Sequence, residues 1–278
     1  MAVSPIDYLL IGHLTADITP QGRQLGGTVA YAARTAAAFG MRVGVLTSAQ
    51  PDEVLLQELR QWAAVVVIPA SATTTFENRY TGEGRVQYIR GVAASLLPDA
   101  VPDAWKTAPL VHLAPIANEV ALEMVSCFPD AVQMVTLQGW LRRWEQDGRV
   151  RIKRWYDAHV LECVDVVVFS EEDIAEAPDM EAELASAARH LIVTRAAKGG
   201  TYYQQGMPTQ YTAFPAEASH PTGAGDIFAA SFFIAWQRLK GNLERAVRIA
   251  AYLSAQSVTR SGLESAPTPE EIQQAFAS

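Results

Sequence analysis

Four residues in the last quarter of the chain, Gly223, Ala224, Gly225 and Asp226, place a single carboxylate after small side chains and before a long apolar run. A helix that begins here has unpaired backbone N–H groups and a partial positive charge at its first turn. Such a helix end can bind a phosphoryl group, because small residues leave the N–H groups accessible. The same groups favour ionised Asp226, which can then accept a hydroxyl proton. A glycine-rich turn capped by an acid is the structural alternative.

Two further carboxylates, Glu171 and Asp173, directly follow the apolar run DVVVFS. Mg²⁺ prefers oxygen ligands and keeps several waters, so these side chains are candidates to hold Mg²⁺ beside a phosphate donor. They also suit the first turn of a helix capped by Ser170, and both roles can coexist. Lys198, which precedes a glycine pair, can reach donor phosphates, although a lysine in such a turn is more often only solvated.

A substrate site is expected near the N-terminus, where Asp17 follows the first apolar strand. Its carboxylate can bind two adjacent hydroxyl groups or, alternatively, cap the turn that follows. Gly26 and Gly27 precede an alanine-rich segment and allow a ligand to approach the backbone, although glycines there also satisfy an ordinary turn.

Short apolar runs alternate with helical stretches along the chain, which indicates parallel strands joined by helices. The first unit is a strand in 6–12, a helix in 28–40 and a strand in 41–48. We predict a three-layer α/β/α fold with a mostly parallel, doubly wound sheet covered on both faces. Further strands are expected at AAVVVIP, LVHLAPI, VQMVTL, DVVVFS and HLIVTRA.

Four segments complete the predicted architecture. Residues 73–91 contain two runs with strand-like alternation of side chains, one on each side of the turn TGEG. They predict a hairpin that is not part of the parallel sheet and that can cover a cleft. Residues 201–214 predict a second antiparallel excursion, and two long helices are expected at about 223–240 and 242–261. The charged segment 140–157 is interpreted as a solvated helix and loop.

Composition narrows the class of protein. The 278 residues are 49% hydrophobic and 19% charged, which favours one folded domain over 1–278. A net charge of −8 without a basic cluster argues against nucleic-acid or membrane partners. Cys127 and Cys163 lack metal-ligand spacing and are expected to be buried thiols in a reducing compartment. The N-terminus lacks signal-peptide features, so a cytoplasmic location is expected.

The stretch TGAGD resembles the signature D-x-T-G-A-G-D of the ribokinase, or PfkB-type carbohydrate kinase, family. IGHLTADIT, LGGTVAYAA, VVVFSEEDI, VTRAAKGG and AAYLSAQSVTRSG resemble other family motifs in the expected order, so the resemblance spans nearly the whole chain. It implies a ribokinase-like fold with lid elements near 14–25 and 73–91. The implied residues are the catalytic base Asp226 with the anion hole Gly223, Ala224 and Gly225; substrate-binding Asp17, Gly26, Gly27 and Tyr31; nucleotide-binding Ser170, Thr194, Lys198, Gly200 and Thr222; and the metal region with Glu171 and Asp173.

Several positions depart from the family pattern. His220 stands where many relatives carry an Asp close to a monovalent cation, so we expect weak or absent K⁺ activation. Ser170 and Asp173 replace the Asn and Glu of the metal motif, and Ala196 replaces a common glycine. Tyr31 stands where sugar-binding relatives often have Asn, which favours a cyclic polyol or a nucleoside over ribose.

The sequence therefore predicts an ATP-dependent, Mg²⁺-requiring kinase that phosphorylates a hydroxyl of a small sugar or polyol, with a myo-inositol-type acceptor favoured. A nucleoside kinase and a non-catalytic sugar- or nucleotide-binding relative are the alternatives. A nicotinamide-linked dehydrogenase is disfavoured, because no G-x-G-x-x-G follows the first strand. Either a monomer or a homodimer through the β lid is expected.

Overall fold

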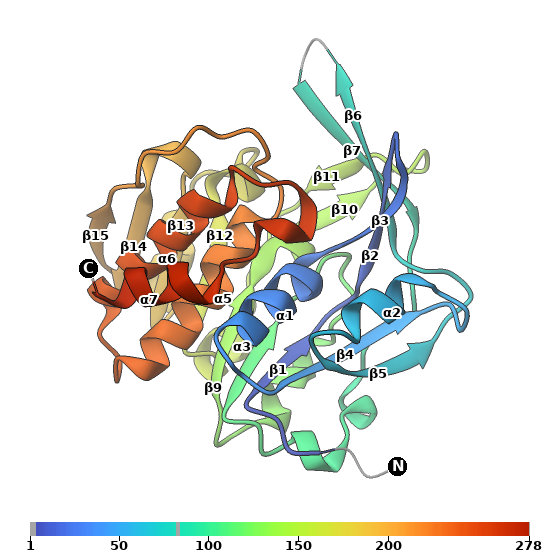
Figure 1. Cartoon of the computed structure of the whole chain (residues 1–278), viewed down its shortest axis with the longest axis horizontal. Coiled ribbons are helices and arrows are strands. Elements are labelled where there is room, and N and C mark those ends of the chain that lie inside the picture. The colour runs from blue at the N-terminus through green and yellow to red at the C-terminus, as the bar shows by residue number, and fades with distance from the viewer. Residues whose placement is uncertain (1–3, 82–83, 278) are drawn as a thin grey trace.

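Within residues 4–81 and 84–277, which the computed structural model describes, nine strands form one large sheet (Figure 1). Neighbouring strands are parallel from β13 across to β5, and only β14 and β15 are antiparallel. The predicted mostly parallel sheet and the antiparallel excursion in 201–214 are confirmed. In sheet order the strands are β15 (Met207–Tyr211), β14 (Gly200–Gln204), β13 (His190–Thr194), β12 (Val166–Ser170), β9 (Val132–Thr136), β8 (Leu110–Leu113), β1 (Tyr8–Ile11), β4 (Val43–Ala49) and β5 (Ala64–Pro69).

Helices cover both faces of this sheet, because its strands carry apolar side chains on each side. One face packs on α1 (Thr28–Ala38), α2 (Leu55–Leu59), α5 (Ala224–Arg238), α6 (Leu243–Ser257) and α7 (Pro269–Ala277). The other face packs mainly on α3 (Ala158–Cys163), α4 (Met180–Ala187) and 3-10 turns. The 3-10 turns of the chain are η1 (Pro98–Ala100), η2 (Asp103–Trp105), η3 (Leu122–Cys127), η4 (Leu137–Gly139), η5 (Glu171–Ile174), η6 (Ala196–Lys198) and η7 (Gly262–Ser265).

A second, four-stranded sheet stands apart from the first, and its strands β6 and β7 project away from the helices (Figure 1). Its order is β3-β2-β6-β7, and Asp17 of β2 lies opposite Phe76 of β6. The predicted hairpin in 73–91 is confirmed, although residues 82 and 83 of its turn lie outside the described residues. The strands are β2 (Thr15–Thr19), β3 (Gly22–Gly26), β6 (Thr75–Thr81) and β7 (Gly84–Gly91).

The segment 140–157 forms a short antiparallel hairpin, so the predicted solvated helix and loop is wrong. Its strands are β10 (Arg142–Trp144) and β11 (Val150–Ile152). The buried ring of Trp140 stacks on Trp155 at 5.2 Å, which anchors both ends of the segment to the body. The Ile89 N–H of β7 donates to the Gly148 carbonyl over 2.8 Å, and Gly148 has φ of 86°. The hairpin therefore extends the smaller sheet toward the body.

The two cysteines differ from expectation. Cys127 and Cys163 are free thiols, but both are partly exposed rather than buried, and each is the last residue of a short helix, η3 or α3. Among the described residues, no helix combines the length and the apolar character that crossing a bilayer requires.

Candidate active site

The proposed anion site lies at the first turn of α5. Gly223 precedes this helix with φ of 87°, and the helix then buries a continuous apolar run. The Ser254 hydroxyl of α6 donates to the Ala224 carbonyl over 3.0 Å, which fixes the turn from the other side. Among the residues that the structure describes, the backbone N–H groups of Gly225 and Asp226 have no hydrogen-bond acceptor. These two donors are therefore available to an anion.

Asp226 is partly exposed, yet protein surrounds most of its carboxylate. This desolvation raises the pKa of Asp226 from 3.8 to about 6. A hydrogen bond from the Thr28 side chain and the positive charge of Arg142 oppose the rise in pKa, whereas the charges of Asp173 and Asp17 add to it. A carboxylate with a pKa just below neutrality suits a general base, because it is ionised at pH 7 and still holds a proton well.

The two glycines of the turn serve different purposes. A Cβ on Gly223 would overlap the ring of Tyr31, and the left-handed backbone there also favours glycine. A Cβ on Gly225 would instead point into open space, with no heavy atom within 4 Å. Gly223 is therefore required by the fold itself, whereas the space at Gly225 remains for a ligand.

The predicted substrate residues gather beside this turn, although the chain separates them widely. A Cβ on Gly26 would overlap the Asp17 carboxylate, so that carboxylate lies against the backbone of β3. The Thr15 hydroxyl donates to Asp17 Oδ1 over 3.0 Å and orients it. Gly27 has φ of 83° directly before α1, where the buried Tyr31 lies.

Tyr31 lies close enough to Asp226 and Asp17 for the charges of both to act on it. Burial raises the pKa of its hydroxyl, and the negative charges of Asp226 and Asp17 raise it further. Tyr31 is thus a neutral phenol near both carboxylates, and it can donate a hydrogen bond to either one or to a ligand between them.

Three of the predicted nucleotide-binding residues lie at the sheet edge where β12 and β13 end and β14 begins. Ser170 at the end of β12 is the register partner of Thr194 at the end of β13, and Gly200 pairs with Thr194 from the other side. Gly200 is buried, and a Cβ there would overlap the Val193 carbonyl. Thr222 is exposed just before α5. The structure thus brings the first three together and places Thr222 on a separate loop.

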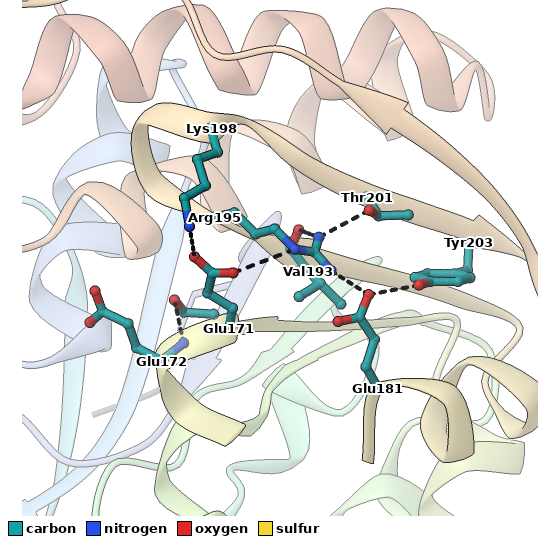
Figure 2. Close-up of polar contacts among 9 residues, drawn as sticks. Glu171, Glu172, Glu181, Val193, Arg195, Lys198, Thr201 and Tyr203 are labelled. Carbon is teal, nitrogen blue, oxygen red and sulfur yellow. Dashed lines mark hydrogen bonds and ion pairs between the residues drawn. The ribbon is translucent and has the colours of Figure 1, made fainter. Parts of the chain in front are cut away.

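Figure 2 shows a charged network beyond these strand ends, centred on Arg195. The Glu171 carboxylate lies between Arg195, at 3.6 Å, and Lys198, at 3.4 Å. Arg195 also pairs with Glu181, which accepts a 2.6 Å hydrogen bond from Tyr203. Desolvation and this bond to Glu181 raise the pKa of Tyr203 to about 12. The predicted metal residue Glu171 is therefore neutralised by two cations.

The other predicted metal residue, Asp173, completes a helix cap. Its Oδ2 accepts from the Ser170 N–H over 2.9 Å, and its Oδ1 accepts from Gln138 over 3.2 Å. In the described part of the chain, no three His, Cys, Asp or Glu side chains gather closely enough to hold a metal ion. Carboxylate oxygens suit Mg²⁺, but here they pair with Arg195 and Lys198 or cap η5, so the described residues hold no preformed metal site.

Three residues of the site escaped the sequence analysis. Thr28 and Arg142 act on Asp226, and Arg195 organises the network around Glu171. Thr28 directly follows the glycine pair Gly26 and Gly27, and this position could have indicated a role for Thr28 in the site. Arg142 belongs to the charged segment that was interpreted as solvated, so its pattern gave no indication of an active-site role.

The chain matches a known family and a curated relative over most of its length. A family model described as pfkB family carbohydrate kinase matches residues 21–271. The cytidine kinase of Thermococcus kodakarensis is 27% identical over 267 residues, covering 88% of this chain and 93% of the relative.

Solved structures are similar over almost the full length. A pyrophosphate-dependent kinase of the ribokinase family, complexed with a pyrophosphate analog and myo-inositol, has a TM-score of 0.81 at 20% identity, covering 96% of this chain and 99% of the other. Arabidopsis thaliana ribokinase, complexed with ribose and ATP, has a TM-score of 0.74 at 15% identity, covering 99% and 100%. These structures share the ribokinase-like fold, and the family model covers most of the sequence. The chain belongs to the pfkB family of carbohydrate kinases and is a phosphotransferase.

Proposed function

We propose that this kinase transfers a phosphoryl group to a hydroxyl of a small polyhydroxy acceptor, with Asp226 as the general base. The observation that carries the proposal is the carboxylate of Asp226 beside the two unpaired N–H groups at the start of α5. The group that accepts the proton and the site that binds the transferred phosphoryl group are then adjacent, as phosphoryl transfer to an alcohol requires.

The acceptor is held by Asp17, whose carboxylate accepts hydrogen bonds from neighbouring hydroxyl groups. Tyr31 provides a neutral donor between Asp17 and Asp226. Asp226 accepts the proton of the attacking hydroxyl, while the N–H groups of Gly225 and Asp226 bind the oxygens of the transferred group. Glu171 and Asp173 would hold a Mg²⁺ ion that comes with the donor, and the ion would neutralise charge on the donor phosphates.

The donor that we propose is ATP, as in the ribokinase complex with ribose and ATP. Lys198 and Arg195 lie at the strand ends where they can approach donor phosphates, after release of Glu171. A pyrophosphate donor is the second candidate, because a structural neighbour is pyrophosphate-dependent. For the acceptor, that neighbour's myo-inositol and the cytidine of the curated relative support a polyol and a nucleoside respectively.

A phosphotransfer screen tests the proposal. Sugars, inositols and nucleosides are each offered with Mg²⁺ and either ATP or pyrophosphate. We expect turnover with at least one acceptor, abolished in Asp226→Asn and retained in the control Asp130→Asn, which changes an exposed aspartate remote from the site. An active Asp226→Asn variant would refute the role of the base. Binding of acceptors without turnover by the wild-type protein would favour the non-catalytic alternative.

A further inference from the structure

A cavity of about 340 Å³ lies between strand β7, the β10–β11 hairpin and the turn η5. This volume is within the usual range for pockets that bind small molecules. One wall belongs to the smaller sheet and its hairpin extension, and the opposite wall belongs to the body of the molecule. The cavity was not anticipated from the sequence, because the hairpin that forms it was not.

The cavity lies on the Arg142 and Asp173 side of the proposed base, although neither Asp226 nor Asp17 lines it. Arg142 and Asp173 both line it, and both act electrostatically on Asp226. The Arg142 guanidinium lies 5.3 Å from the centre of the Phe76 ring, on the same strand pair as Asp17. An acceptor whose hydroxyl group reaches Asp226 can therefore extend past Arg142 into the cavity.

The uncharged part of the cavity lining combines apolar and planar polar groups. Leu141, Val150 and Ile152 contribute apolar surface. Gln87 and Gln138 contribute amides, which both donate and accept hydrogen bonds. A flat ring with apolar faces and a hydrogen-bonding edge matches this combination, whereas a saturated polyol has no such faces.

The charges of the cavity argue against an anionic occupant. Six of the lining residues are charged, namely the cations Arg142, Arg149 and Arg151 of the hairpin and the acids Glu172, Asp173 and Glu176 in or just after η5. Among them, Arg149 lines the hairpin wall and Glu172 lines the wall of η5. In the chain as the structure describes it, neither side chain belongs to an ion pair. Figure 2 shows the Glu172 carboxylate directed away from the Arg195 network. Both signs of charge therefore face the cavity, and they suit a neutral occupant with donors and acceptors better than a second phosphate or a carboxylate.

We propose that the acceptor is a nucleoside, with its ribose held by Asp17 and its base seated in this cavity against Gln87 and Gln138. This inference rests on the proposed function, because it places the hydroxyl group of the ribose at Asp226. It goes further by assigning the cavity to the base and by selecting the class of acceptor.

The test compares nucleosides with their free sugar, ribose, and with a cyclic polyol. Initial rates are measured for ribose, cytidine, uridine, adenosine and myo-inositol, with wild-type protein and with Gln87→Leu. Leucine has nearly the volume of glutamine but no amide, and among the residues that the structure describes the Gln87 side chain bonds only Asn78. Gln146→Leu, an exposed glutamine of the hairpin turn outside the cavity, is the matched control.

We expect the best nucleoside to exceed ribose in kcat/KM by about 100-fold or more. Gln87→Leu should lower that value by about tenfold or more for the nucleoside. It should leave turnover of ribose or myo-inositol unchanged, and Gln146→Leu should change neither. Ribose or myo-inositol as the better acceptor, or an equal loss for all acceptors in Gln87→Leu, would overturn the inference and leave the proposed kinase intact. Absence of turnover with every acceptor would overturn both.

Discussion

Replacing Asp226 by asparagine should stabilise the protein while it abolishes turnover. The folded structure raises the pKa of Asp226 from 3.8 to about 6, chiefly through desolvation. The folded protein therefore holds this proton more tightly than the unfolded chain does. The contribution of this carboxyl group to stability is fully present below pH 4 and declines as the pH rises through about 6.

The magnitude follows from the rise in pKa. At pH 8 the buried charge disfavours folding by at most about 3 kcal/mol, since one pKa unit corresponds to about 1.4 kcal/mol. Asparagine has nearly the same shape, can still accept the hydrogen bond from Thr28 and carries no charge. The free energy of unfolding of Asp226→Asn should therefore exceed that of the wild type by about 2–3 kcal/mol at pH 8, and by little at pH 4.

Urea unfolding at intervals between pH 4 and pH 8 measures this difference, with Asp130→Asn as the control for the loss of one exposed charge. The difference should grow between pH 4 and pH 6 and stay constant above. A variant that is less stable at pH 8, or a difference that is independent of pH, would show that Asp226 is not desolvated as the structure indicates.

Three further predictions concern neighbouring positions. The Gly225→Ala variant should melt within about 2 °C of the wild type, because its Cβ meets open space, but its kcat should fall by about tenfold or more. The free energy of unfolding of Gly223→Ala should instead fall by more than about 1 kcal/mol. Equal thermal stability of the two variants would contradict this distinction. The acidic limb of the pH–kcat/KM profile is expected near pH 6. Arg142→Gln should shift this limb to higher pH, because Arg142 lowers the pKa of Asp226. A limb that does not move would show that Arg142 does not act on Asp226. Turnover in K⁺ should equal turnover in a bulky organic cation, because His220 replaces a common carboxylate, and a strong K⁺ requirement would refute the expectation.

The parts of the fold that the sequence predicted are those in which local pattern and tertiary structure agree. The parallel strands are apolar runs, and α5 begins at its glycines, so both were recognisable without knowledge of their neighbours. The motifs containing Asp17 and Asp226 also indicated which distant segments meet. The roles proposed for these residues stay predictions until they are tested.

The hairpin and the residues that depend on it could not be predicted in the same way. Segment 140–157 is rich in charge, and its β structure depends on the stacking of Trp140 on Trp155 and on pairing with β7. Neither contact has a local signature. Arg142 was consequently overlooked, because its proximity to Asp226 arises only when the hairpin has docked. Likewise, the pairing of Glu171 with Arg195 requires the register of two strands.

The backbone link between β7 and the hairpin connects the position of the smaller sheet to the acidity of the base. Arg142 belongs to the hairpin, and the hairpin is hydrogen-bonded to β7 through Gly148 and Ile89. Any outward swing of β7 that carries the hairpin along moves a positive charge away from Asp226. Without that charge the pKa of Asp226 rises, so the carboxylate is more readily protonated than it is with the hairpin docked. For the base proposed above, docking of the hairpin would thus favour the ionised form that accepts a proton.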